Sequence, residues 1–247
     1  GASVNDVVEM VAFDVFSVND SVSAKDGGSF AGTVGFGAGI ASPVTINGAT
    51  PTLTIGDAGA EDAKIVFDGN AQDFHIGLDD SADSLTIGKG SALGTTTSMA
   101  IDANGIITKP LQPAFMVQPT SAQSNIATAS LITIVFNNER FDNNADFASN
   151  TFTAPVTGKY QLNITLYLVN IDSASDFYQI RLVTSNRIYP IVFDPDFGQD
   201  ATYWNLIMPI LTDMDASDTA YFDIKQQSGA AQTDIDNSST FSGYLVC

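Results

Sequence analysis

The sequence contains 247 residues, of which 44% are hydrophobic and 15% are charged. This length and composition suffice for one large or two modest packed domains, and they exclude a disordered chain. The chain carries 28 acidic residues against 9 lysines and arginines, which gives a formal net charge of -19. Because binding to phosphates needs basic groups, this balance argues strongly against nucleic acid as a partner.

The single cysteine, Cys247, is the last residue of the sequence, so no internal disulfide can form. No run of about 18 or more apolar residues occurs, which predicts no membrane-spanning helix and no membrane insertion. The first residues also lack the basic region followed by an apolar region that is typical of a signal peptide.

The first predicted element covers residues 1–25, where valines recur at spacings that alternate between four and three residues. These valines are Val4, Val8, Val11, Val15, Val18 and Val22. Such spacing is typical of the a and d positions of a coiled coil, and β-branched residues at both positions favour three or more chains. The alternation of Val11, Phe13 and Val15 is equally compatible with a β-strand. We therefore predict a trimerisation segment that is either a short coiled coil or a strand.

Residues 26–110 are rich in Gly, Ser, Thr, Ala and Asp and contain short apolar clusters about ten residues apart. The clusters are TLTIG (52–56), AKIVFDG (63–69), DFHIGLD (73–79), SLTIG (84–88) and SMAIDANG (98–105). Repeated short strands predict an elongated structure in which one unit is too small to bury its own apolar residues. Three copies packed around one axis would cover these residues, so we predict a repetitive trimeric β shaft.

Residues 111–247 contain longer apolar segments that alternate cleanly with polar residues. One of them places Tyr160, Leu162, Ile164, Leu166 and Leu168 at every second position. Many alternating strands without helical periodicity are typical of a β-sandwich or barrel. The fold class predicted for the whole chain is therefore all-β.

One stretch of this region, FNNERFDNNADFASNTFTAPVTGKY (136–160), places aromatic residues at regular intervals among Asn and Asp. Its spacing resembles the signature of C1q-like globular heads, which are jelly-roll β-sandwiches related to tumour necrosis factor. The matching positions are Phe136, Asp142, Phe147, Phe152, Gly158 and Tyr160. Other phrases that resemble the family are PAF (113–115), FTAPVTGKY (152–160), LTDMDASDTAYF (211–222) and FSGYL (241–245). The resemblance covers residues 111–247 and implies a head that forms homotrimers, with Phe136, Phe152 and Tyr160 in its core.

The sequence departs from the C1q pattern in three respects. Four residues separate Phe147 from Phe152 where the family has six, and Leu162 and Ile164 stand where the family favours aromatic residues. The collagen-like stalk of many members is absent. The repeats of residues 26–110 instead resemble shaft segments of tail-fibre proteins of marine bacteriophages, which can carry such heads.

The inventory of reactive side chains predicts no catalytic residues. The sequence contains one histidine, His75, and no G-x-S-x-G, P-loop, H-E-x-x-H or paired-cysteine zinc motif. His75 lies in the cluster DFHIGLD, where a polar ring on an alternating strand is a simpler interpretation than a catalytic base. We therefore predict that the protein is not an enzyme.

Two loops, DPDFGQD (194–200) and DMDASD (213–218), contain three aspartates each. Carboxylate oxygens in a flexible loop suit calcium, and the family resemblance implies that calcium can lie near the axis of such trimers. Neither loop follows the EF-hand pattern, and an Asp-rich turn in solvent is the simpler interpretation. Calcium is retained as an alternative, and no other cofactor is predicted.

The predicted ligand-binding residues lie in and after the first of these loops. They are Asp194, Asp196, Phe197, Asp200 and Trp204. Aromatic rings stack on the apolar faces of sugars, and carboxylates accept hydrogen bonds from sugar hydroxyls. Tyr203 and Trp204 should point to opposite faces of one strand, so we expect at most one of them to be exposed.

These patterns together predict a homotrimeric tail-fibre protein of a phage, located on the virion. Its heads would attach to a host cell-surface molecule, either a glycan or an outer-membrane component. The expected partners are further copies of the chain, the host receptor and other tail proteins. Two alternatives stay open: a tailspike-type enzyme that degrades polysaccharide, and a secreted cellular adhesion protein with a C1q-like head.

Overall fold

The structure, a computed structural model, describes residues 45–247, and these residues form an all-β chain as the sequence predicted. The described range contains one short 3-10 helix, η1 (Asp80–Ala82). None of the described residues forms a helix that is long and apolar enough to span a membrane. The valine-rich segment 1–25 and the first part of the predicted shaft, residues 26–44, lie outside the described residues.

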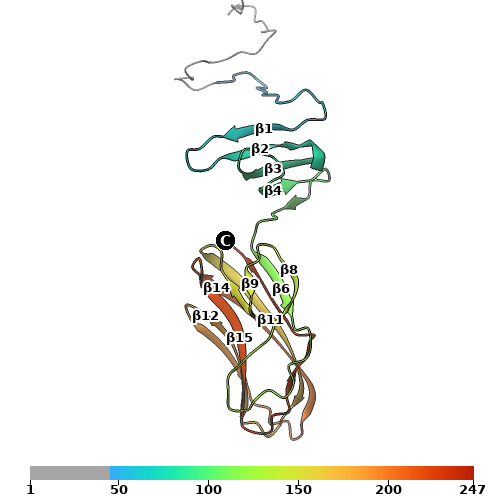
Figure 1. The fold of residues 1–247 in the computed structure, drawn as a ribbon, viewed down its shortest axis with the longest axis vertical. Helices are drawn as coiled ribbons and strands as arrows, with labels where there is room; N and C mark the ends of the chain where they lie inside the picture. The colour runs from blue at the N-terminus through green and yellow to red at the C-terminus, as the bar shows by residue number, and fades with distance from the viewer. Residues whose placement is uncertain (1–44) are drawn as a thin grey trace, which may run out of the picture. The chain divides into compact units, whose positions relative to one another are not determined.

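A five-stranded antiparallel sheet, which we call the small sheet, is built from residues 63–108 (Figure 1). Its strands are hydrogen-bonded in chain order: β1 (Ala63–Phe67), β2 (Phe74–Asp79), β3 (Ser84–Lys89), β4 (Thr97–Ile101) and β5 (Ile107–Thr108). Four of the predicted apolar clusters form β1 to β4, but the cluster TLTIG (52–56) forms no strand. The LTIG copy at 85–88 lies between β2 and β4, whereas the copy at 53–56 has no partner strand in the described part of the chain. Neighbouring strands therefore decide the conformation of this repeat.

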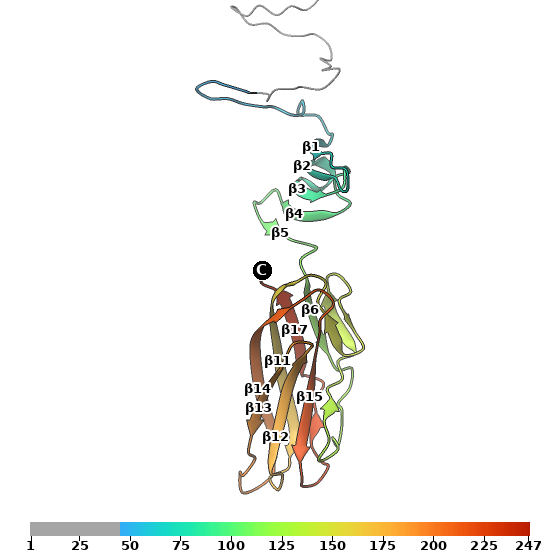
Figure 2. The ribbon, with the colours of Figure 1, turned by 90° about the vertical axis from the view of Figure 1, so that its left-hand side faces the viewer.

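The strands that follow form two six-stranded antiparallel sheets, which pack face to face (Figures 1 and 2). Their bounds are β6 (Ala114–Gln118), β7 (Ile132–Thr133), β8 (Asn138–Asp142), β9 (Phe147–Ala148), β10 (Thr151–Thr153), β11 (Gly158–Ile171), β12 (Phe177–Thr184), β13 (Ile188–Phe193), β14 (Ala201–Met214), β15 (Thr219–Gln227), β16 (Asp234–Ile235) and β17 (Thr240–Leu245). One sheet has the order β14-β11-β17-β6-β8, with β16 beside β11. The other has the order β13-β12-β15-β10-β9, with β7 beside β15. We call this β-sandwich the head.

The core of the head lies between the two sheets and follows the predicted alternation. On β11, every second side chain from Tyr160 to Leu168 is fully buried, and the same holds for Tyr178, Ile180 and Leu182 on β12 of the facing sheet. Because side chains alternate along a strand, this pattern buries one face of each sheet and leaves the other face outward. The predicted core residues on the alternating strand are confirmed.

The phenylalanines of the spaced stretch 136–160 meet in one aromatic cluster. The ring of Phe115 stacks on Phe152 with centroids 4.7 Å apart, and it meets the edge of Phe241 at 5.0 Å. Phe136 and Phe147 each contact Phe241 at 5.7 Å. Phe136, Phe152 and Tyr160 are all buried, which confirms their predicted role in the core.

The polar residues between these rings close the turns of the same stretch. The Asp142 carboxylate accepts hydrogen bonds from the backbone N–H groups of Asp146 and Phe147, at 3.0 and 2.8 Å. The Asn150 side chain accepts a bond from the N–H of Phe136 at 2.8 Å. Asp and Asn thus satisfy backbone donors at the points where the chain turns.

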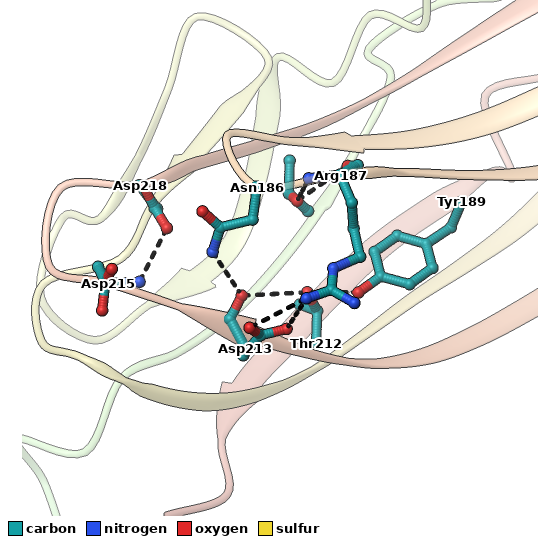
Figure 3. Close-up of polar contacts among 8 residues, drawn as sticks. Asn186, Arg187, Tyr189, Thr212, Asp213, Asp215 and Asp218 are labelled. Atoms are coloured by element: carbon teal, nitrogen blue, oxygen red, sulfur yellow. Dashed lines mark hydrogen bonds and ion pairs between the residues drawn. The ribbon is translucent and has the colours of Figure 1, made fainter.

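Polar contacts connect the edge strands of the two sheets, β13 and β14, as Figure 3 shows. The hydroxyls of Tyr189 and Thr212 lie 3.0 Å apart. Arg187 forms an ion pair of 3.0 Å with Asp213, whose backbone oxygen accepts a bond from the Asn186 amide. Both edge strands also carry a proline, Pro190 or Pro209, which removes a backbone donor from the open edge. Each proline thereby weakens further strand pairing at its edge.

On the outward face of the sheet that contains β11, a continuous area over β14, β11 and β17 carries no charge, and Lys159 and Asp213 lie at its margin. Its outward residues are Gln161, Asn163, Thr165, Tyr167 and Val169 on β11, Tyr203, Asn205, Ile207, Pro209 and Leu211 on β14, and Thr240, Ser242 and Tyr244 on β17. Ile207 is 67% exposed and Leu211 is 56% exposed. We call these residues the outer face of the head. The other sheet differs, since its outward side holds the pair Arg181–Asp223.

Substitution of Phe241 by Ala should strongly destabilise the head. The ring is fully buried and contacts Phe115, Phe136, Phe147 and Phe222, so its loss leaves a cavity and should cost about 3–5 kcal/mol. Urea unfolding at a fixed chain concentration measures the change. Phe197→Ala is the control, because that ring is 38% exposed and should cost clearly less. Equal losses for the two variants would contradict the proposed centre of the core.

Candidate functional site

Three loops lie together at one end of the head, as Figures 1 and 2 show. They are residues 172–176 after β11, residues 194–200 before β14 and residues 228–233 after β15. At the opposite end of the head, Lys159 donates its backbone N–H to the backbone oxygen of Cys247. We call the end with the three loops the loop end.

A buried carboxylate fixes two of these loops to each other. Asp172 is only 4% exposed. One of its oxygens accepts the N–H of Ala174 at 2.9 Å, and the other accepts the N–H of Ala230. The Gln226 amide donates to the backbone oxygen of Ala230 at 2.7 Å. Charge-assisted bonds of this kind hold the loop 172–176 against the loop 228–233.

Asp200 connects the third loop to the other two. Its Oδ1 accepts both the backbone N–H and the hydroxyl of Ser173, at 2.9 and 2.8 Å. Its Oδ2 accepts a bond of 2.8 Å from the Gln232 amide. These hydrogen bonds, first that from Gln232 and then those from Ser173, lower the pKa of the Asp200 carboxyl below its ordinary value. The carboxylate is therefore held in its charged form and in a fixed orientation.

A polar pocket of about 300 Å³ opens beside Asp200. It is lined by Asn125, Asn170, Asp200, Ala201, Thr202 and Gln232. Amides, a hydroxyl and a carboxylate offer both donors and acceptors, and this lining contains no lysine or arginine among the described residues. The pocket therefore suits a neutral ligand with several hydroxyl groups better than an anion.

Two asparagines of the lining have left-handed backbone conformations. Asn170 has a φ of 56° and interrupts the pairing of β11 with β14, where Val169 pairs with Tyr203 and Ile171 with Ala201. Asn125 has a φ of 53°, and its N–H donates to the Asp234 carboxylate at 2.7 Å. Asn tolerates this conformation better than most residues. The pocket thus forms where the strand pairing is locally broken.

Four aromatic rings stack in a series from the core to the surface of the loop end. Tyr178 lies on Phe193 with centroids 5.1 Å apart, and Phe193 lies on Trp204 at 5.5 Å. Trp204 in turn lies on Phe197 at 5.0 Å, with an angle of 25° between the rings. The first ring is completely buried and the last is 38% exposed. The packing fixes Phe197 and Trp204 as a rigid apolar surface.

The predicted binding residues fall into two groups in the structure. Phe197 and Trp204 stack on each other, and Asp200 lines the polar pocket. Asp194 and Asp196 lie in the same loop but outside that lining, and the Asp194 carboxylate accepts the N–H of Asp196. The expectation that only one of Tyr203 and Trp204 is exposed is wrong, because Trp204 lies at the edge of the sandwich and is 36% exposed on the inward side.

The two Asp-rich loops do not form a calcium site within one chain. The structure contains no group of three or more His, Cys, Asp or Glu residues in residues 45–247 that could hold a metal ion. In the first loop, both carboxylate oxygens of Asp200 already accept hydrogen bonds. In the second loop, Asp213 pairs with Arg187 and Asp218 accepts the N–H of Asp215 (Figure 3). A cation beside Asp213 would be repelled by the arginine.

The side chain of His75 is buried. It is 1% exposed on β2, and its Nδ1 donates to the backbone oxygen of Gly90 at 2.9 Å. A carbonyl oxygen only accepts hydrogen bonds, so the proton must be on Nδ1. A buried ring in this position cannot reach a substrate, which agrees with the structural interpretation of this histidine.

Comparison with family models assigns the β-sandwich of the head to a known family. The model of the C1q domain matches residues 114–246, and the chain belongs to the C1q family. A search of curated proteins found no match.

Several solved structures are similar to the head. The globular domain of zebrafish complement 1qA protein is 17% identical, with 55% of this chain and 98% of that chain covered and a TM-score of 0.42. Murine APRIL at pH 8.5 is 8% identical, with 55% and 99% covered and a TM-score of 0.40. A second structure of murine APRIL, at pH 8.0, is 11% identical, with 54% and 98% covered and the same TM-score of 0.40.

Sequence reasoning missed four residues that shape the pocket: Asn125, Asn170, Ser173 and Gln232. They lie in three separate segments, and only the fold brings them to Asp200. A signal existed for Asn170 alone, because an asparagine late in an apolar alternating strand is compatible with an irregular backbone. The others are ordinary polar residues of loops.

Removal of the Gln232 amide should raise the pKa of Asp200. A folded-state pKa below the unfolded value of about 3.9 means that the carboxylate stabilises the loop end above that pH, and that this contribution is lost as the pH falls through the folded pKa. In Gln232→Ala the titration midpoint of Asp200, measured by carbon NMR, should move up toward the ordinary value. Gln199→Ala is the control, since it leaves both Ser173 and Gln232 in place. An unchanged midpoint in Gln232→Ala would contradict the assigned hydrogen bond.

Proposed function

We propose that the protein is a homotrimeric receptor-binding protein of a phage tail fibre, whose heads attach to a host cell-surface molecule. Membership of the C1q family supports a trimeric, ligand-binding head, because such domains assemble as trimers and bind ligands or receptors. The repeated short strands before the head support the tail-fibre role and a place on the virion. The observation that carries the proposal is the uncharged outer face of the head.

The outer face supports contact between copies of the chain. A protein with a net charge of -19 repels its own copies wherever acidic residues meet. The outward residues of β11, β14 and β17 carry no charge between Gln161 and Val169, Tyr203 and Leu211, and Thr240 and Tyr244. Interfaces are depleted of charge at their centres and enriched in Tyr and other large apolar side chains. Three heads could therefore pack through this face without burying like charges.

The loop end supports recognition of a neutral glycan. Phe197 and Trp204 offer a fixed ring surface for the apolar side of a sugar. Asp200 and the amides of the pocket beside it would accept and donate hydrogen bonds to hydroxyl groups. A pocket of about 300 Å³ encloses a small group, so the affinity of one head would be weak. Three heads on one fibre would compensate through avidity.

If the heads pack through the outer face, a charge introduced on β14 should dissociate the trimer. The wild-type chain should have three times the mass of one chain by light scattering at micromolar concentration. Ile207→Asp should lower that mass, because a carboxylate would be desolvated inside the interface. Val192→Asp is the matched control, since Val192 is 55% exposed on the opposite sheet and should leave the trimer intact. A wild-type monomer would reject the homotrimer.

If the loop end binds a glycan, substitutions in its binding residues should reduce attachment of the protein to host cells. Trp204→Ala and Asp200→Ala should each reduce adsorption to host cells, and glycan binding on an array, by about tenfold, the loss of one stacking or charged hydrogen-bond contact. Asp176→Ala is the matched control at the loop end, because Asp176 is exposed and does not line the pocket. Circular dichroism must show that all three variants fold. Unchanged binding in both test variants would place the binding site elsewhere on the head.

A secreted cellular adhesion protein is the second candidate, because the C1q domain itself fits that role equally well. The genes beside the coding sequence distinguish the two candidates: virion structural genes support the tail fibre. The enzyme alternative is tested by incubating the protein with host capsular polysaccharide. Shortened chains would establish a tailspike-type activity and contradict a purely binding function.

A further inference from the structure

The small sheet is covered on its polar side and open on its apolar side. His75, Asp79, Ser84 and Thr86 point to one side and are buried. The loop of residues 90–96 covers that side, since His75 bonds to the backbone oxygen of Gly90 and Lys64 bonds to that of Ser91 at 2.7 Å. This arrangement is the reverse of the usual one, in which the apolar side of a sheet faces a core.

The open side carries rows of apolar residues that run across the strands. Strand pairing aligns one row from β1 to β5, one row from β1 to β4 and one pair at the end of β1 and β2. The first row contains Ala63, Leu78, Leu85, Ile101 and Ile107. The second row contains Ile65, Ile76, Ile87 and Met99, and the pair is Phe67 with Phe74. We call these residues the apolar face. Only Lys89, beside Phe74, adds a charge to it.

The apolar face is as large as the largest exposed apolar patch of a typical monomer. Phe67 is 58% exposed and Phe74 is 51% exposed, so each leaves on the order of 100 Å² of ring surface uncovered. With the exposed Ile and Leu side chains the face reaches on the order of 500 Å², at the upper end of the roughly 300–600 Å² of the largest patch on a typical monomer. Together with a rim of surrounding polar residues, the area of the apolar face approaches the roughly 800 Å² of surface that each partner buries in a standard protein–protein interface.

We propose that the apolar face packs against the same face of two other copies of this chain, so that the three small sheets share one apolar core. The inference rests on the proposed homotrimeric head. Only residues 109–113 separate β5 from β6, so trimerisation of the heads brings three small sheets together. A tether this short gives an effective concentration on the order of millimolar, far above that of a separate protein partner. Another copy of the chain is therefore the occupant that the connection favours.

Two adjacent residues of β1 provide a matched test. Ile65 belongs to the apolar face, whereas Val66 points to the other side, and in one chain they are 41% and 36% exposed. Ile65→Cys and Val66→Cys would be prepared in the full chain, each with Cys247→Ser to remove the native thiol. The rate of maleimide labelling would be measured under native conditions and in urea, with the mass in solution recorded on the same samples.

The expected result is a trimer in which Ile65→Cys is labelled about tenfold or more slowly than Val66→Cys, because a thiol inside an interface reacts only when the interface opens. In urea the two rates should be equal. A trimer with equal native rates would overturn this inference and leave the trimeric head intact. A monomer would overturn the homotrimer and this inference together. Ile87→Cys on β3 repeats the test if Ile65→Cys fails to fold, since Ile87 lies in the same row.

Discussion

The register of β11 is the constraint on which the rest of the head depends. Every second side chain from Tyr160 to Leu168 is buried between the sheets, so the side chains from Gln161 to Val169 must face outward. β14 and β17 pair with β11 on either side and therefore take over the same division between inward and outward residues. A slip by one residue would bury Asn and Gln and expose Leu and Ile. One register thus sets both the core and the uncharged face on which copies of the chain can meet.

The same strand also positions the candidate binding site. β11 ends at Ile171, directly after the left-handed Asn170, and the next residue is the buried Asp172. Asp172 holds the loop after β15, and Ser173 holds Asp200. The pocket adjoins the outer face at the loop end, where Asn170 follows Val169 and Thr202 precedes Tyr203.

The parts of the fold that could be predicted from the sequence are those in which the information is local. Alternation along β11 and the spacing of Phe136, Phe147 and Phe152 indicate inward positions whatever the partner strand is. The pocket could not be predicted in this way, because Asp200 finds its partners 27 and 32 residues away. The two LTIG copies show the same limit. Their letters are identical, but only the copy in β3 has strands on both sides, so tertiary pairing overrides local preference.

Within residues 45–247, two exposed faces are suited to contacts between copies of the chain, and they differ in chemistry. The outer face of the head mixes Asn, Gln and Thr with Tyr, Ile and Leu, so it resembles an interface with hydrogen bonds. The apolar face of the small sheet has almost no polar side chains, so it gains from burial alone and fixes no register by itself. An assembly built from both would take its alignment from the heads and part of its stability from the small sheets. The acidic residues elsewhere would repel other copies of the chain that approach without matching these faces, which favours a defined assembly over unspecific association.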